Sequence, residues 1–247
     1  MSTIKQLTSP DRQSGLPAAL QWTAPGRAVV FVLAATSIWC LLAEMYGLCN
    51  MRTFTFVILL PATVALYGLA LLDRTRGDRR LWRAVVVGTL AGLVGAIAYD
   101  LFRLPFVFSD AWGLGRLGVP QMPLFKVFPR FGALILGQPL EQPSYSLAAH
   151  LIGWAYHFSN GATFGVMFAA MIGDAQWRTG GGWPWAVLMA VGIEACLLLS
   201  PYAQFFGIHL NARFIAVTLA AHVVFGLGMG AYFSYRSAHH GGVAVDC

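Results

Sequence analysis

Long apolar runs alternate with short polar segments along this chain. The six runs cover residues 27–48, 53–73, 82–104, 146–172, 183–203 and 213–235. Each run is close to the roughly 20 residues that a helix needs to cross the hydrocarbon core of a bilayer. Pro61 interrupts the second run, where we expect a kink. The pattern predicts an all-α integral membrane protein with six transmembrane helices.

The composition agrees with lipid as the solvent of this chain. Hydrophobic residues make up 57% of the 247 residues and charged residues only 11%, whereas a soluble domain carries about 25% charged residues. The net charge is +6, but the basic residues lie in short segments between apolar runs. Such a distribution is typical of topology signals and not of a phosphate-binding face. We therefore expect the lipid bilayer, and no nucleic acid, as a partner.

The segment DRTRGDRRLWR between the second and third runs sets the expected orientation. Its arginines are Arg74, Arg76, Arg79, Arg80 and Arg83. Short loops with such an excess of arginine stay in the cytoplasm. With six spans, both termini are then cytoplasmic as well. We expect a protein of the bacterial inner (cytoplasmic) membrane.

The apolar runs divide the chain into four parts. These are a polar cytoplasmic tail at 1–26, an N-terminal two-helix hairpin at 27–73, a four-helix repeat bundle at 82–235, and a second cytoplasmic tail at 236–247. Residues 105–145 form the one long loop, on the outer side. Its middle, LFKVFPRFGALILG, is apolar but too short and interrupted to span, so we expect an interfacial or re-entrant segment over the outer mouth of the bundle. The alternative is a loop that only packs on the outer surface.

A short pattern occurs twice in the last four helices. It reads His-x3-Gly-x3-Gly, as His157-Gly161-Gly165 and again as His222-Gly226-Gly230. Residues four apart descend one face of a helix, and glycines at that spacing let two helix backbones approach closely. We predict that these glycines are helix contacts. We also predict that the last four helices form two tandem hairpin repeats.

Several ionisable or amide side chains lie within the apolar runs. From a helical rise of about 1.5 Å per residue, His157, Glu194 and His222 lie near the centres of their spans. The other ionisable side chains lie further toward the outer side, and an unpaired group in lipid is costly, so these residues face the bundle. We predict an outward-facing polar pocket. Its ligand-binding residues would be His157, Glu194, His222, Asp100, His150, Asn160 and Glu44.

Two interpretations of these side chains remain open. In the first, histidines and carboxylates pair with one another and hold the helices together. In the second, they bind a proton, a polar ligand or a metal. Two histidines and a carboxylate are a known ligand set for iron and zinc, which makes His157, His222 and Glu194 the candidate metal ligands. Two histidines on neighbouring helices also ligate haem. A metal or haem is therefore a candidate cofactor, although the tighter HxxxH and HExxH motifs do not occur at these histidines.

Four stretches carry a resemblance to a known group of proteins. They read GLVGAIAYDLFRLP, GWAYHFSNGATFGVMFAAMIG, the segment 194–201, and HVVFGLGMG. Over residues 84–235 the chain resembles small bacterial inner-membrane proteins of the YagU type and related families. Those families have no established activity, so the resemblance implies a membrane location and a histidine before a small-residue stripe in each of two helices.

Three functions are compatible with this pattern. The first is a multi-pass membrane protein whose outward-facing polar pocket binds or passes a small ligand or a proton. The second is an intramembrane enzyme that depends on a metal or haem. The third is a structural subunit, which would pack as a homo-oligomer or within a larger membrane complex.

Overall fold

A computed structural model of the protein describes residues 22–178 and 182–240. These residues form helices and connecting loops, with no strand among them. The long helices are α1 (Ala24–Met45), α3 (Leu60–Arg76), α4 (Arg80–Val107), α6 (Leu147–Arg178), α7 (Trp183–Leu199) and α9 (Ala212–His240). The short ones are α2 (Met51–Phe54), η2 (Thr55–Leu59), η3 (Leu114–Leu117), α5 (Val127–Leu136) and α8 (Tyr202–Phe205). The prediction of an all-helical protein is confirmed for this part of the chain.

Four segments are long and apolar enough to cross a membrane. They are Ala24–Met45, Met51–Arg76, Arg80–Val107 and Ala212–Ser237. Two shorter apolar helices, α5 and α7, accompany them. The segment Met51–Arg76 contains α2, η2 and α3, and η2 is a π-helical turn directly before Pro61. A wider turn accommodates a proline, which has no N–H to donate and crowds the preceding turn. The kink expected at Pro61 stays a prediction, and the feature observed beside it is this π-helical turn, which ends at Leu59.

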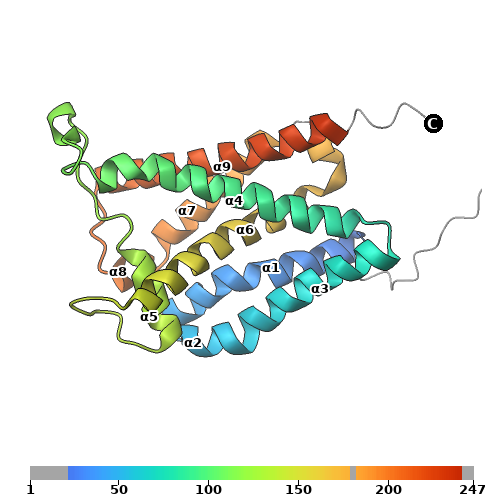
Figure 1. Cartoon of the computed structure of the whole chain (residues 1–247), viewed down its shortest axis with the longest axis horizontal. Coiled ribbons are helices and arrows are strands. Elements are labelled where there is room, and N and C mark those ends of the chain that lie inside the picture. The colour runs from blue at the N-terminus through green and yellow to red at the C-terminus, as the bar shows by residue number, and fades with distance from the viewer. Residues whose placement is uncertain (1–21, 179–181, 241–247) are drawn as a thin grey trace, which may run out of the picture.

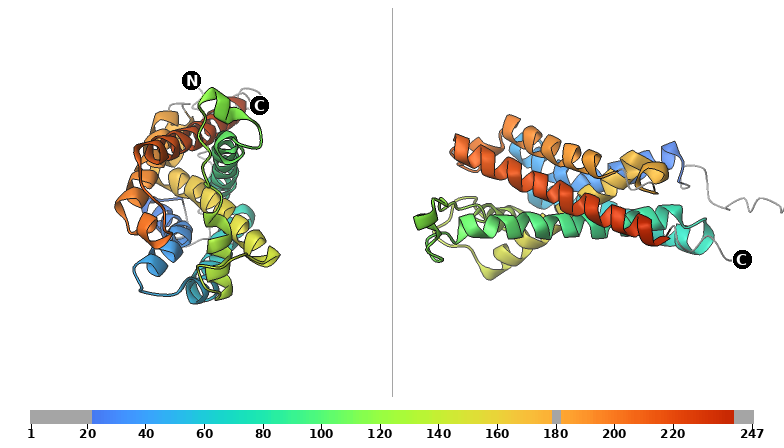
Figure 2. Two further views of the ribbon diagram at one scale, coloured as in Figure 1. Left: turned by 90° about the vertical axis from the view of Figure 1, so that its left-hand side faces the viewer. Right: turned by 90° about the horizontal axis from the view of Figure 1, so that it is seen from above.

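The helices form an elongated bundle with two distinct ends. α6 runs through the middle, between α4 and α1, while α9 packs on α4 and α7 packs on α9 (Figure 1). One end carries α2, α5 and α8. The other carries the α3–α4 turn and the C-terminal end of α9 (Figures 1 and 2). The arginine-rich segment and the long loop after α4 therefore lie at opposite ends of the bundle.

The predicted glycine contacts are present, and they differ between the two hairpins. A Cβ atom on Gly92 would lie 2.0 Å from the carbonyl oxygen of Gly161, and one on Gly165 would lie 2.0 Å from that of Gly88. These two contacts join α4 to α6 with backbone against backbone. On α9, a Cβ atom on Gly226 would lie 2.5 Å from the Cα of Val187 in α7. Each His-x3-Gly-x3-Gly helix thus packs its glycines on the long helix that precedes it, α6 on α4 and α9 on α7.

Aromatic side chains fill the bundle on the side of the glycines away from the long loop. Phe168 of α6 and Phe233 of α9 are both buried, with ring centroids 5.3 Å apart. Phe164 and Phe225 of the same two helices are 6.4 Å apart, edge to face. Met229, also fully buried, belongs to the same core. This half of the bundle is therefore a packed apolar core.

The apolar middle of the long loop forms the helix α5. A Cβ atom on Gly132 of α5 would lie 1.8 Å from the carbonyl oxygen of Ala149, and one on Gly153 of α6 would lie 1.8 Å from that of Phe128. The two helices are therefore in direct backbone contact. α5 is a packed part of the bundle at the end opposite the arginine-rich segment.

We expect alanine at two of the contact glycines to destabilise the protein. In Gly165→Ala and Gly226→Ala the new methyl group meets backbone atoms, which cannot move aside as a flexible side chain can. Overpacking of this kind costs about 1–3 kcal/mol. Gly68 of α3 has no atom within 4 Å of an added Cβ. Gly68→Ala should therefore leave the free energy of unfolding unchanged or raise it by up to about 1 kcal/mol. Reversible unfolding in mixed micelles measures all three, and equal effects would contradict a contact role for the glycines.

Candidate functional site

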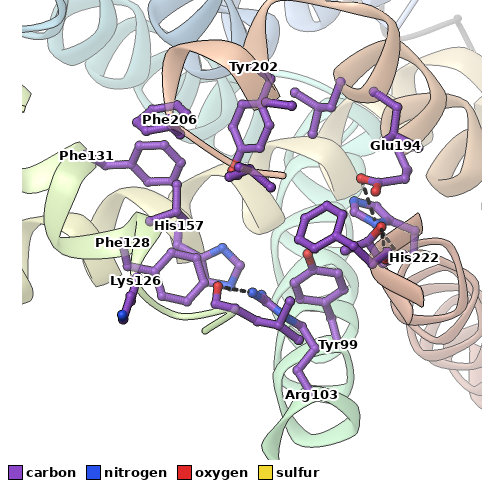
Figure 3. Close-up of a pocket in the computed structure, with 18 of the residues that line it drawn as sticks. Tyr99, Arg103, Lys126, Phe128, Phe131, His157, Glu194, Tyr202, Phe206 and His222 are labelled. Carbon is purple, nitrogen blue, oxygen red and sulfur yellow. Dashed lines mark hydrogen bonds and ion pairs between the residues drawn. The ribbon is translucent and has the colours of Figure 1, made fainter. Parts of the chain in front are cut away.

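A cavity of about 530 Å³ lies in the half of the bundle next to α5 and α8. Helices α1, α4, α6, α7 and α9 form its sides, and α5 and α8 cover it (Figure 3). Its lining combines aromatic rings with charged and polar side chains. They include Tyr99, Arg103, Lys126, Phe128, Phe131, His157, Asn160, Glu194, Tyr202, Phe206 and His222.

His157 of α6 pairs with Asp100 of α4 at the edge of this cavity. The Nε2 atom of His157 is 2.9 Å from Oδ2 of Asp100, and Nη1 of Arg103 is 3.4 Å from the other carboxylate oxygen. All three side chains are at least 85% buried, with exposures of 15%, 12% and 5%. Buried charges require such partners, because an unpaired one costs several kcal/mol. The carboxylate of Asp100 is therefore shared by two donors.

Arg103 is enclosed by aromatic rings. Its guanidinium carbon lies 4.6 Å from the ring centroid of Tyr99, 5.0 Å from that of Phe125 and 5.4 Å from that of Phe128. Its Nη2 atom donates to the backbone carbonyl of Leu124, which fixes the segment before α5 to the end of α4. Guanidinium groups favour such positions against ring faces. Arg103 therefore joins α4 to the loop that covers the cavity.

His222 of α9 lies beside Glu194 of α7. Its Nδ1 atom donates to the carbonyl oxygen of Thr218 at 2.9 Å, and Oε2 of Glu194 is 3.3 Å from the same nitrogen. The two side chains are 12% and 6% exposed. Because the Thr218 carbonyl already accepts the Nδ1 proton, the Glu194 oxygen receives at most a second, weaker share of it. This pair joins α7 to α9 at the cavity wall (Figure 3).

The ring of Tyr99 stands between the two histidines. Its centroid is 4.9 Å from that of His222 and 6.0 Å from that of His157. His157, His222 and Glu194 thus border one cavity, but only His222 and Glu194 contact each other. No three histidine, cysteine, aspartate or glutamate side chains lie together as metal ligands in residues 22–178 and 182–240. These contacts therefore do not support the prediction that His157, His222 and Glu194 together bind a metal.

The remaining predicted ligand residues divide between the cavity and other places. Asn160 lines the cavity, and its Oδ1 atom has no hydrogen-bond partner within the described part of the chain. His150 is exposed in the first turn of α6, edge-on to Tyr145. Glu44 accepts a hydrogen bond from the backbone N–H of Met51 at the start of α2. His150 and Glu44 do not line this cavity.

Sequence reasoning missed the basic and aromatic side chains of this site. Arg103 follows Asp100 by three residues, so the two share a helix face, and that spacing was a usable signal. Lys126 and Arg130 lie in the apolar middle of the long loop, and neither was among the predicted pocket residues. Arg130 donates a hydrogen bond to the backbone carbonyl of Phe206, which ties α5 to α8. It also forms an ion pair with the carboxylate of Glu141. No sequence signal placed the aromatic residues of α5 and α8 on one cavity, because their contacts join segments far apart in the chain.

Comparisons of this chain with known proteins identified no related protein. No protein-family model, curated protein or solved structure matches this chain. The resemblance to YagU-type proteins accordingly stays a prediction. The function has to be argued from the cavity and its side chains.

We expect the His157–Asp100 pair and the His222–Glu194 pair to contribute independently to the free energy of unfolding. Double-mutant cycles with His157→Ala and Asp100→Asn, and with His222→Ala and Glu194→Gln, should each give a coupling of about 0.5–3 kcal/mol in the free energy of unfolding. The crossed cycle, His157→Ala with Glu194→Gln, should be additive within about 0.5 kcal/mol. A crossed coupling as large as the other two would instead place the three originally predicted residues in one cluster.

Proposed function

We propose that this chain is a six-span protein of the bacterial cytoplasmic membrane whose cavity binds a small ligand from the outer side. The observation that carries the proposal is the cavity of about 530 Å³. Each of four helices contributes at least one ionisable side chain to it or to its edge, among them Asp100, His157, Glu194 and His222. Ligand sites are typically concave, mostly apolar and equipped with a few convergent polar groups.

The bundle geometry supports the six-span arrangement. α6 and α7 would be the two spans beyond the four segments that are long and apolar enough to cross a membrane. The arginine-rich α3–α4 turn and the C-terminal end of α9 lie at the same end of the bundle (Figure 1). Exposed apolar side chains on the second of those segments, among them Phe56, Val57, Val64 and Leu71, suit contact with lipid. By the distribution of arginine, the end with α5 and α8 would face outward.

The cavity has exposed polar side chains at one end only. Gln121, Lys126, His209 and Asn211 line it and are exposed in the loops next to α5 and α8. Toward the other end it meets the contact of Phe164 with Phe225 and the apolar core beyond. This arrangement favours binding from the outer side over passage through the bundle in the described conformation. No contact among the described residues favours a metal- or haem-dependent enzyme or a structural subunit over this function.

The topology can be tested with single cysteines in a chain whose four native cysteines are replaced. Ser144 is exposed in the long loop and Asp78 in the α3–α4 turn. Ser144→Cys should react with an impermeant thiol reagent in intact cells, and Asp78→Cys should react only after the membrane is opened. The reverse labelling pattern would invert the orientation.

Accessibility of the cavity can be tested in the same way. Thr218 lines the cavity at the level of the His222–Glu194 pair. Thr218→Cys should react with a small cationic methanethiosulfonate reagent added outside intact cells. The matched control keeps only native Cys196, which is exposed on α7 but does not line the cavity, and which should stay unreactive in lipid. If Thr218→Cys reacts neither in cells nor in opened membranes, the cavity does not admit solutes and the proposed function is wrong.

A further inference from the structure

Glu194 differs from the other carboxylates around the cavity, because neither an arginine nor a lysine pairs with it in the described part of the chain. Asp100 has Arg103 at 3.4 Å, and Glu141 has Arg130 at 3.0 Å. Within the described part of the chain, the charge-bearing neighbour of Glu194 is His222 alone. The side chain of Glu194 is nevertheless 94% buried, with 6% exposed.

Neither carboxylate oxygen of Glu194 makes a hydrogen bond within the described residues. The Nδ1 proton of His222 goes to the Thr218 carbonyl at 2.9 Å, and the 3.3 Å approach to Oε2 is an ion-pair distance without hydrogen-bond geometry. Glu194 lines the cavity, and Figure 3 shows its carboxylate beside His222. An ionised carboxylate in such surroundings favours any cation that reaches it.

The surrounding rings suit a cation as well. Tyr99, Tyr202, Phe214 and Phe225 line the same cavity. Aromatic faces attract ammonium groups, most strongly where water is excluded. The hydroxyl groups of Tyr99 and Tyr202 have no hydrogen-bond partner among the described residues and point inward in Figure 3. They add two hydroxyl oxygens to the lining that Glu194 shares.

The positive charges at the cavity do not compete for Glu194. Arg103 and Arg130 each have a carboxylate of their own. Lys126 is exposed in the loop at the mouth, where water solvates its charge. Among the described buried carboxylates at the cavity, Glu194 is therefore the one without an arginine or lysine partner.

We propose that the ligand of this cavity is an organic amine, with its ammonium group on Glu194 and an apolar body against the aromatic wall. The inference rests on the proposed binding function and deepens it by naming the ligand class. An amine supplies both the charge that Glu194 needs and N–H donors for its oxygens. The volume of about 530 Å³ lies within the range of small-molecule sites.

Three probes of equal shape separate charge from apolar fit. They are 4-phenylbutylamine, 4-phenylbutan-1-ol and 4-phenylbutyrate, titrated by calorimetry into the full-length protein in phosphatidylcholine nanodiscs, with empty nanodiscs subtracted. The amine should bind with one-to-one stoichiometry and at least tenfold more tightly than the alcohol or the acid. An alcohol that binds as tightly as the amine would overturn the inference, and so would tighter binding of the acid.

Matched variants assign the effect to one carboxylate. Glu194→Gln should lose at least tenfold in affinity for the amine while its affinity for the alcohol stays the same, which also shows that the variant is folded. Glu194→Asp keeps the charge and should retain a preference for the amine. Glu44→Gln makes the same chemical change at a carboxylate that does not line the cavity, and should bind as the unchanged protein does.

The outcome also separates this inference from the proposed function. If Thr218→Cys is labelled from outside but Glu194→Gln binds the amine unchanged, the cavity is a site and its ligand is not an amine. If no probe binds although the cavity is labelled, the amine inference is wrong and the binding site remains. If the thiol reagent does not reach the cavity, both the proposed binding function and the amine inference are wrong.

Discussion

Close backbone contact between α4 and α6 is the constraint on which the rest of this bundle depends. Gly88 and Gly92 of one helix meet Gly165 and Gly161 of the other with no side chain between them. In lipid the hydrophobic effect does not drive helices together, so close packing and interhelical polar contacts have to do so. The contact holds α6 in the centre of the bundle, and α6 carries His157 to the carboxylate of Asp100.

The same contact determines where the bundle is hollow. Glycines bring α4 and α6 together on one side of His157, and aromatic rings fill that half. Beyond His157, α6 instead packs on α5, which Arg130 ties to α8, while Arg103 ties the segment before α5 to α4. The volume left between these elements is the cavity. Its polar groups therefore lie where close packing ends and the covering loop begins.

Charge in this cavity is balanced unequally. Asp100 is surrounded by an arginine and a histidine, while Glu194 has only a histidine whose proton is donated elsewhere. A buried carboxylate without an arginine or lysine partner is costly. This asymmetry supports the proposed binding site over purely structural pairing. It also directs the chemistry toward a positively charged group.

The sequence alone determined the helical class, the glycine contact faces and four of the polar residues that line the cavity, namely His157, Asn160, Glu194 and His222. Those features depend on local composition and on the 3.6-residue period of a helix, and both can be identified from the amino-acid sequence. The tertiary structure decided which histidine meets which carboxylate. It also decided that His150 and Glu44 lie away from the cavity, and that α5 and α8 close it. Such contacts depend on helix rotation and on loops that join distant segments, and no local pattern encodes them.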